Sequence, residues 1–382
     1  MMKARRVLFL LALMAGSMPG SGVPAAEPIR IAAIFSVTGA AAPSNAPSLD
    51  GARLAVREVN RRGGVLGRPL VLVEIDNLST PIGSKVAADR AVKQGVTAIV
   101  GSAWSSHSLA IARVAQEHAV PMVTNMSTHP DVSRIGDYIF RVCFTDPFQG
   151  RVMAQFALEH VGAREAVIIK DLASDYSIGL AREFRRNFEE GGGRVYMELD
   201  YKHSQGSFRG VAGQIRRPGP DIVFLPGHDE SGAIIREADQ AGISTVFLGG
   251  DGWVGESFMK RGGRFLKKGF YCTHWDEDAD TEISREFVEL ARRSPGPRAP
   301  QVNASKALAY DAVLLIADAL ERAGSTEGKA LRRALAETRG FKGVTGSISF
   351  NEHGDPFKGA VIMELSNGST RYLKTVTPNL GE

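Results

Sequence analysis

Residues Ile29–Phe35 read IRIAAIF, a short apolar run rich in β-branched side chains, which predicts a buried strand. Ser48–Arg62 follows as SLDGARLAVREVNRR, which places its apolar residues on one helical face and ends at Gly63-Gly64, and this predicts a helix. Leu70–Ile75, LVLVEI, predicts the next strand. Strands that alternate with helices indicate a parallel sheet covered by helices on both faces.

The same alternation continues to Thr124 and starts again at Ala166. Further strands are predicted at Thr97–Val100, Pro121–Thr124, Ala166–Lys170, Val195–Leu199, Ile222–Leu225 and Val246–Leu248. The helices predicted between them are Ser84–Gln94, Ser106–His118, Ile178–Glu190, Phe208–Ile215 and Glu230–Ala241. Three more helices (Thr281–Arg293, Ser305–Ala323, Gly328–Thr338) precede a β-like tail at Gly346–Phe350 and Ala360–Glu364. Two such runs predict an α/β protein with two doubly wound parallel-sheet lobes.

The first 26 residues have a pattern of their own. A basic MMKARR start is followed by the apolar run Val7–Gly16 and by small residues up to Ala26. This order predicts a secretory signal peptide of residues 1–25, cleaved after Ala25. Val7–Gly16 is too short to span a bilayer, which needs about 20 apolar residues. No Cys stands near the cleavage point to accept a lipid, so we expect an exported periplasmic protein that is not lipid-anchored.

Composition and charge exclude several classes of function. The 382 residues favour two domains, and 43% of them are hydrophobic. The formal charge of +4 becomes +1 when the three basic residues Lys3, Arg5 and Arg6 leave with the signal peptide, so little basic field remains to attract nucleic acid. No Gly-x-Ser-x-Gly, Walker or His-Glu-x-x-His motif occurs, and the histidines are scattered. We therefore predict no enzyme, no cofactor and no metal site.

Ligands of doubly wound proteins bind at the carboxyl ends of the strands, where loops meet helix N-termini. Four segments at such positions carry polar or aromatic side chains: Val100–His107, Val123–Thr128, Asp171–Ser177 and Gly249–Trp253. Hydroxyls and free N–H groups in the first two suit a carboxylate, and an acid between glycines in the fourth suits an amine. Taken one at a time, these residues are explained at least as well by helix capping and turn formation.

Four motifs relate the chain to a known family. They are IAAIFSVTG at 31–39, GARLA at 51–55, NRRGGVLGRPL at 60–70 and DYSIG at 175–179. With these motifs in order, the sequence resembles the periplasmic solute-binding proteins of ABC importers for branched-chain amino acids, the leucine/isoleucine/valine type. The match covers essentially the whole mature chain, and the Asn-x-x-Gly-Gly-Val-x-Gly string is its most specific part.

The resemblance implies two lobes joined by three hinge crossovers, near Arg141–Thr145, Tyr271–Trp275 and Gly346–Asp355. The N-terminal lobe is expected to comprise residues 26–142 plus 274–346, and the C-terminal lobe residues 143–273 plus 347–382. Spacing alone leaves a disulfide and two buried thiols equally open for Cys143 and Cys272. Their implied places on two crossovers favour a hinge disulfide.

The resemblance also implies a binding site. Ser105 and Thr128, with backbone N–H groups near Met126, are expected to hold the α-carboxylate of an amino acid. Asp251 and Tyr176 are expected to meet its α-amino group from the opposite lobe. The other residues expected to line the cleft are Trp104, Ser106, His228, Asn45 and Trp253. Because Trp104, Met126 and Trp253 stand where smaller residues occur in relatives, a plain leucine-sized pocket is in doubt.

The function implied is capture of an amino acid, branched-chain or related, followed by closure of the lobes and delivery to an ABC permease in the inner membrane. A monomer suffices for this. An alternative that uses the same lobes is a periplasmic sensor for amides or aromatic acids that feeds a signalling partner. The residues do not separate the two functions.

Overall fold

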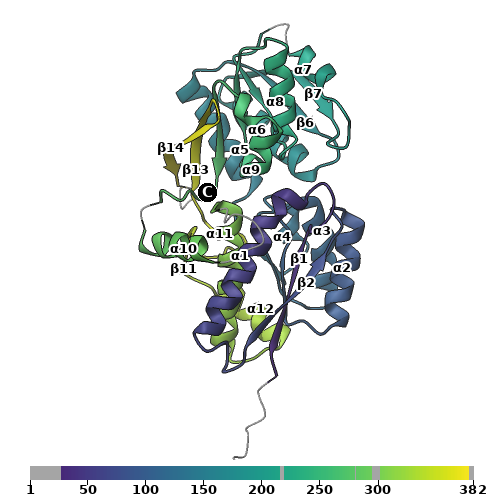
Figure 1. The fold of residues 1–382 in the computed structure, drawn as a ribbon, viewed down its shortest axis with the longest axis vertical. Helices are drawn as coiled ribbons and strands as arrows, with labels where there is room; N and C mark the ends of the chain where they lie inside the picture. The colour runs from purple at the N-terminus through teal and green to yellow at the C-terminus, as the bar shows by residue number, and fades with distance from the viewer. Residues whose placement is uncertain (1–26, 216–218, 280, 295–301, 378–382) are drawn as a thin grey trace, which may run out of the picture.

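The structure is a computed structural model that describes residues 27–215, 219–279, 281–294 and 302–377. The predicted signal peptide lies outside the described residues. Figure 1 shows two lobes, one above the other, and each lobe is built on its own sheet.

The lower lobe contains a parallel sheet in the order β2-β1-β3-β4-β5. Its strands are β1 Ile29–Phe35, β2 Leu70–Asp76, β3 Ala98–Gly101, β4 Met122–Thr124 and β5 Ile139–Arg141. One face carries α2 Pro81–Lys93, α3 Ser105–Glu117 and α4 Asp131–Arg134, and the other carries α1 Ala42–Arg61, α10 Glu282–Arg293, α11 Ala304–Ala323 and α12 Gly328–Ala336. Along β1, Ile31 and Ala33 join the core on the α1 side, and Ala32 and Ile34 join the core on the α2 side. Because alternate side chains point to opposite faces of the sheet and both faces are buried, the run is apolar throughout.

The upper lobe contains a seven-stranded sheet in the order β14-β13-β10-β9-β8-β6-β7. Its strands are β6 Glu165–Asp171, β7 Arg194–Tyr201, β8 Ile222–Phe224, β9 Val246–Gly249, β10 Gly269–Thr273, β13 Ala360–Ser366 and β14 Ser369–Val376. The helices are α5 Asp146–Phe156 and α6 Asp175–Glu190 on one face, and α7 Arg209–Gln214, α8 Ser231–Gln240 and α9 Glu256–Arg261 on the other. Together with the lower lobe, these layers confirm the predicted α/β class with two doubly wound lobes.

One edge of the upper sheet corrects the expectation of a wholly parallel sheet. β13 pairs antiparallel with both β10 and β14. β13 and β14 are joined by a short turn in which Asn367 and Gly368 both have positive φ, and such a turn connects only antiparallel neighbours. Most β14 side chains are exposed, so the strand lacks the apolar pattern that would have predicted it.

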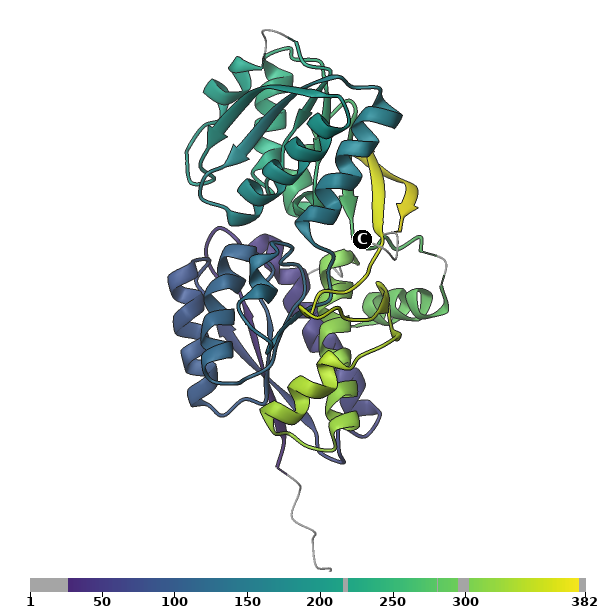
Figure 2. The same ribbon diagram turned by 180° about the vertical axis from the view of Figure 1, so that it is seen from behind.

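Within the described residues, the chain passes between the two lobes three times. The passages run from β5 to α5, from β10 to α10, and from β12 (Gly346–Ile348) to β13. β12 pairs only with β11 (Phe341–Gly343), in a separate two-stranded ribbon. Figure 2 shows the third passage rising from the lower lobe to the yellow β13–β14 hairpin. The residue boundaries of the lobes given above stay a prediction.

Arg141 ties the first passage to the third. The side chain is fully buried, and its Nε donates to Asp355 Oδ1 at 2.6 Å. Its guanidinium also donates to the Ser127 carbonyl at 2.5 Å and to Ser133 Oγ at 2.8 Å. A buried charge is tolerated only when it is paired and hydrogen-bonded. The Arg141 side chain in the hinge therefore requires these partners.

The expected hinge disulfide is not formed. Cys143 and Cys272 are both buried free thiols. Cys143 Sγ lies 3.4 Å from the Ser127 carbonyl, and Cys272 Sγ lies 3.3 Å from Gln149 Oε1, so each thiol donates to a partner of its own. The two residues belong to different crossovers that face different cores, which spacing along the chain could not show.

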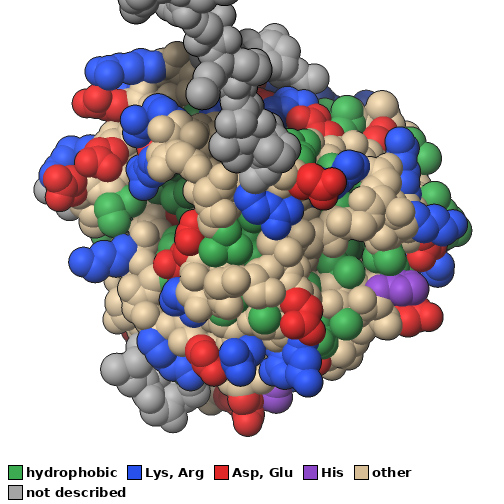
Figure 3. All heavy atoms as spheres, turned by 90° about the horizontal axis from the view of Figure 1, so that it is seen from below, with side chains coloured by type: hydrophobic (Ala, Val, Ile, Leu, Met, Phe, Trp, Pro, Cys, Tyr) green, Lys and Arg blue, Asp and Glu red, His purple; other side chains and the backbone are tan. Residues whose placement is uncertain are grey.

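The surface agrees with the small net charge. Figure 3 views the molecule from below, and on this face Lys and Arg side chains are interspersed with Asp and Glu. Among the helices of the described ranges, none combines the length and the apolar character needed to cross a bilayer.

Candidate ligand-binding site

A cavity lies between the two lobes, where the carboxyl ends of their strands face each other. Its lower wall follows β3 and β4 and the starts of α1 and α11, and consists of Ser44, Ala103, Trp104, Ser105, Met126 and Ser305. Its upper wall follows β8 and β9 and the start of α6, and consists of Tyr176, His228, Asp251, Gly252 and Val254. The free volume is about 30 Å³, which has room for about two water molecules.

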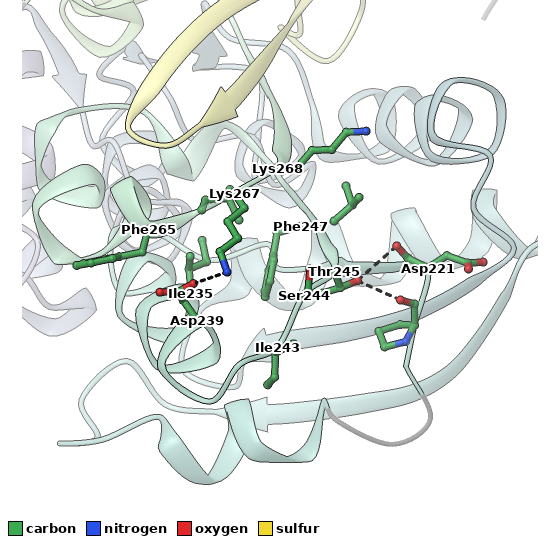
Figure 4. A pocket seen from close by; sticks show the side chains of 13 residues that line it. Asp221, Ile235, Asp239, Ile243, Ser244, Thr245, Phe247, Phe265, Lys267 and Lys268 are labelled. Carbon is green, nitrogen blue, oxygen red and sulfur yellow. Dashed lines mark hydrogen bonds and ion pairs between the residues drawn. The ribbon is translucent and has the colours of Figure 1, made fainter.

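A larger cavity of about 350 Å³ lies at the opposite end of the upper lobe's strands (Figure 4). Three of its four charged side chains already have partners, because Lys267 lies 3.3 Å from Asp239 and Asp221 accepts the backbone N–H of Arg164 at 2.8 Å. Within the described part of the chain, no buried side-chain polar atom that lacks a partner belongs to its walls. We therefore place the candidate site in the smaller cavity, which both lobes line.

The lower wall offers hydrogen-bond donors. Ser105 begins α3, and its Oγ accepts the backbone N–H of His129 at 3.3 Å, so the hydroxyl proton is available to a ligand. The first N–H groups of a helix have no partner within it, and they favour an anion. Thr128 is fully buried, and its Oγ1 has no hydrogen-bond partner. It does not line the cavity, so of these two hydroxyls only that of Ser105 can meet a ligand directly.

The upper wall offers a carboxylate. Asp251 is 3% exposed, its Oδ2 lies 2.9 Å from His274 Nε2, and its Oδ1 has no hydrogen-bond partner among the described residues. Burial lowers the pKa of His274, so the neutral ring donates from Nε2 to the carboxylate. Tyr176 Oη accepts the N–H of Gly252 at 3.1 Å and keeps its own proton for a ligand. An unsatisfied buried polar atom costs about 1–3 kcal/mol, and a cation in the cavity would remove this cost.

Four stacked rings cross the cavity from one lobe to the other. His107 and Trp104 of the lower lobe lie 5.4 Å apart, Trp104 and His228 lie 4.2 Å apart, and His228 and Tyr176 of the upper lobe lie 4.9 Å apart, all as ring centroids. Burial is the main cause that lowers the pKa of His107 and the pKa of His228 to about 4. Both imidazoles are therefore neutral in this stack at neutral pH.

A polar contact also joins the lobes. Ser106 Oγ accepts the backbone N–H of Asp175, at the start of α6, at 3.1 Å. This bond and the stack of Trp104 on His228 show that the structure is a closed form. Ser106 thus contacts the other lobe, and its expected contact with ligand stays a prediction.

Two further residues expected in the cleft lie elsewhere. Asn45 is fully buried in α1, where its Nδ2 donates to the Ala41 carbonyl at 3.0 Å. Trp253 is buried in the core of the upper lobe, stacks on Phe258 at 4.9 Å and donates from Nε1 to the Leu225 carbonyl at 3.1 Å. Asp251–Trp253 is a 3₁₀ turn, in which residues two apart point in different directions. Asp251 therefore reaches the cavity and Trp253 the core.

A set of buried polar groups behind the upper wall was not predicted from the sequence. Gln149 donates from Nε2 to Asp146 Oδ1 at 2.7 Å, and its Oε1 accepts the N–H of Asp251 at 3.4 Å. Burial raises the pKa of Asp146 to about 7. Asp146 opens helix α5, which was not predicted, and His274 lies on a crossover far from Asp251 along the chain. The Asp-Pro pair at 146–147 is a helix-start pattern that could have revealed α5.

The fold and the two-sided cavity define a protein that encloses a small molecule between hinged lobes. The sequence model of the periplasmic binding protein family matches residues 28–370, and the chain belongs to this family.

Three relatives show how far the likeness extends. A crystal structure of the leucine-binding protein LivK from Thermotoga maritima is 34% identical, covers 92% of this chain and 99% of its own, and has a TM-score of 0.86. The branched-chain amino acid binding protein LivJ from Streptococcus pneumoniae, solved with isoleucine, is 27% identical, covers 92% and 100%, and also has a TM-score of 0.86. The leucine-, isoleucine-, valine-, threonine- and alanine-binding protein of Pseudomonas aeruginosa is 28% identical over 92% of this chain and 93% of its own.

Proposed function

We propose that this protein captures a free aliphatic α-amino acid, of the branched-chain set or related to it, and delivers it to an ABC permease in the inner membrane. The observation that carries the proposal is the opposition of an unsatisfied acceptor and an available donor across one cavity. Asp251 Oδ1 is a buried acceptor in the upper lobe, and the Ser105 hydroxyl is an available donor in the lower lobe. A zwitterion satisfies both groups at once.

The named ligands of the relatives support the same class. LivJ holds isoleucine, and the Pseudomonas relative is named for leucine, isoleucine, valine, threonine and alanine. An aromatic acid, the alternative ligand, brings a carboxylate for Ser105 but no cation for Asp251. Its binding would leave the Asp251 oxygen buried and unpaired, at a cost of about 1–3 kcal/mol.

Closure follows from where these groups lie. A ligand held at Ser105 satisfies Asp251 and Tyr176 only when the lobes meet, so ligand favours the closed form by its differential contacts. The permease then recognises the closed protein. The proposal includes export to the periplasm through the signal peptide of residues 1–25, the absence of a lipid anchor, and a monomeric state.

Calorimetric titration with amino acids, amides and aromatic acids tests this function, after bound ligand has been removed by unfolding and refolding. We expect an aliphatic amino acid to bind more tightly than any aromatic acid or amide. Asp251→Ala should weaken that binding more than about tenfold, which is about 1.4 kcal/mol. Binding of benzoate in preference to every amino acid would reject the proposal. Unchanged amino-acid uptake by cells that lack the gene would favour a sensor.

A further inference from the structure

Trp104 forms the bulkiest wall of the cavity between the lobes. It follows β3 and directly precedes Ser105, so its indole lies beside the proposed carboxylate site. The charged ends of an amino acid are taken up by Ser105 and Asp251. The ligand side chain can contact only the rest of the wall. The apolar side chains there are those of Ala103, Trp104, Met126 and Val254.

Three histidine rings hold the indole in place. His228 stacks on it at 4.2 Å with an interplanar angle of 6°, His107 stacks at 5.4 Å, and His203 meets its edge at 6.0 Å. Because His228 and His203 come from the upper lobe, the indole cannot swing away without breaking contacts between the lobes. Met126, by contrast, has a flexible side chain that can adapt to a ligand.

The whole cavity beside this fixed wall has a free volume of about 30 Å³, so any amino acid enters it only by displacing side chains, and a longer ligand side chain needs a larger displacement. A shift of the flexible Met126 side chain makes room for a ligand side chain that is a hydrogen or a methyl group more readily than for an isobutyl group. Forcing extra methylene groups into a packed site pushes side chains off their rotamers. We infer that Trp104 restricts the site to small aliphatic amino acids, glycine and alanine, and disfavours leucine and isoleucine. The inference rests on the proposed function, since it assumes that the cavity binds an α-amino acid.

Calorimetric titration of the refolded full-length mature protein with glycine, alanine, valine, leucine and isoleucine tests the inference. The wild type should bind alanine or glycine at least about tenfold more tightly than leucine. Trp104→Ala should raise the affinity for leucine, and so shift the alanine-to-leucine ratio by at least about tenfold. The second variant, Trp104→Leu, should shift the alanine-to-leucine affinity ratio by an amount between those of the wild type and Trp104→Ala. Ile82→Ala, which removes an 81% exposed side chain from the same lobe, should leave the ratio unchanged.

The outcomes are distinct. A wild type that prefers leucine or isoleucine to alanine overturns the inference and leaves the proposed function standing. An unchanged ratio in both Trp104 variants also overturns the inference. A wild type that binds no amino acid overturns the proposed function together with the inference. Because the wild-type ratio needs no variant, a variant that fails to fold does not prevent a decision.

Discussion

The indole of Trp104 and the imidazole of His228 lie parallel, 4.2 Å apart, and they belong to different lobes. The two rings line the cavity, and their stacking also stabilises the contact between the lobes. Aromatic pairs of this kind contribute about 0.5–1.5 kcal/mol beyond the area that they bury. The same residues therefore influence both which ligand fits and how readily the lobes close.

His228→Ala should shift the ligand-free protein toward an open form. The stack on Trp104 is lost, and with it about 1 kcal/mol of the contact between the lobes. Small-angle X-ray scattering without ligand should show a larger radius of gyration than for the wild type. His228→Phe keeps a ring in this place and should stay near the wild-type value. Equal compactness of His228→Ala and the wild type would show that the stack has no part in closure.

Ligand binding should weaken as the pH falls below about 6.5. Burial is the main cause that lowers the pKa of His228 from 6.5 to about 4, and nearby Asp229 and Asp251 offset it only in part. A histidine whose pKa is lower in the closed form favours closure fully above its open-form pKa. That contribution is lost as the pH falls from about 6.5 toward about 4, by up to about tenfold in affinity per pH unit.

Titration of ligand at pH 7.5, 6.0 and 5.0 measures this dependence. His228→Phe removes the titrating group while keeping a ring, so its affinity should vary less over the same range. A wild-type affinity that is constant from pH 7.5 to 5.0 would contradict the prediction.

Replacing Arg141 by Met should lower the free energy of unfolding by about 3–5 kcal/mol. The change leaves Asp355 in the hinge without its cation, and the loss of one partner of a buried pair is costly. Urea unfolding followed by fluorescence measures the effect. The double variant Arg141→Met with Asp355→Asn should recover part of the loss. No recovery would mean that the other hydrogen bonds of Arg141, such as the one to Ser133, account for the effect.

The two cysteines should be unreactive in the native protein and fully reactive after unfolding. Both thiols are buried, and burial raises the pKa of Cys143 to about 12, so almost no thiolate exists near pH 8. Alkylation followed by intact-mass measurement should show no label on the native protein and two labels on the protein unfolded without reductant. Zero labels after unfolding would reveal a disulfide.

Features of this molecule that depend on residues close together in the sequence can be predicted from it, and features that depend on contacts between distant segments cannot. The buried strands and amphipathic helices were predicted because their apolar periodicity is local, as along Ile29–Phe35. β14 was not, because an exposed edge strand has no such pattern. The residues that line the cavity follow strand ends, and that rule located their segments, while the family resemblance singled out Ser105, Tyr176 and Asp251. Trp253 was misplaced because its direction depends on a short 3₁₀ turn that composition does not reveal.

The groups that support the site were beyond sequence reasoning for a related reason. His274 meets Asp251 only through the hinge, and Gln149 reaches the same loop from α5. Contacts of this kind follow from how the lobes are assembled, not from spacing along the chain.

A crystal structure of the refolded protein with its tightest-binding amino acid tests the central claim most directly. We expect the ligand ammonium to lie within hydrogen-bond distance of Asp251 Oδ1 and the ligand carboxylate to lie against Ser105. A ligand bound in the reverse orientation, or in the larger cavity beside Lys267, would contradict it.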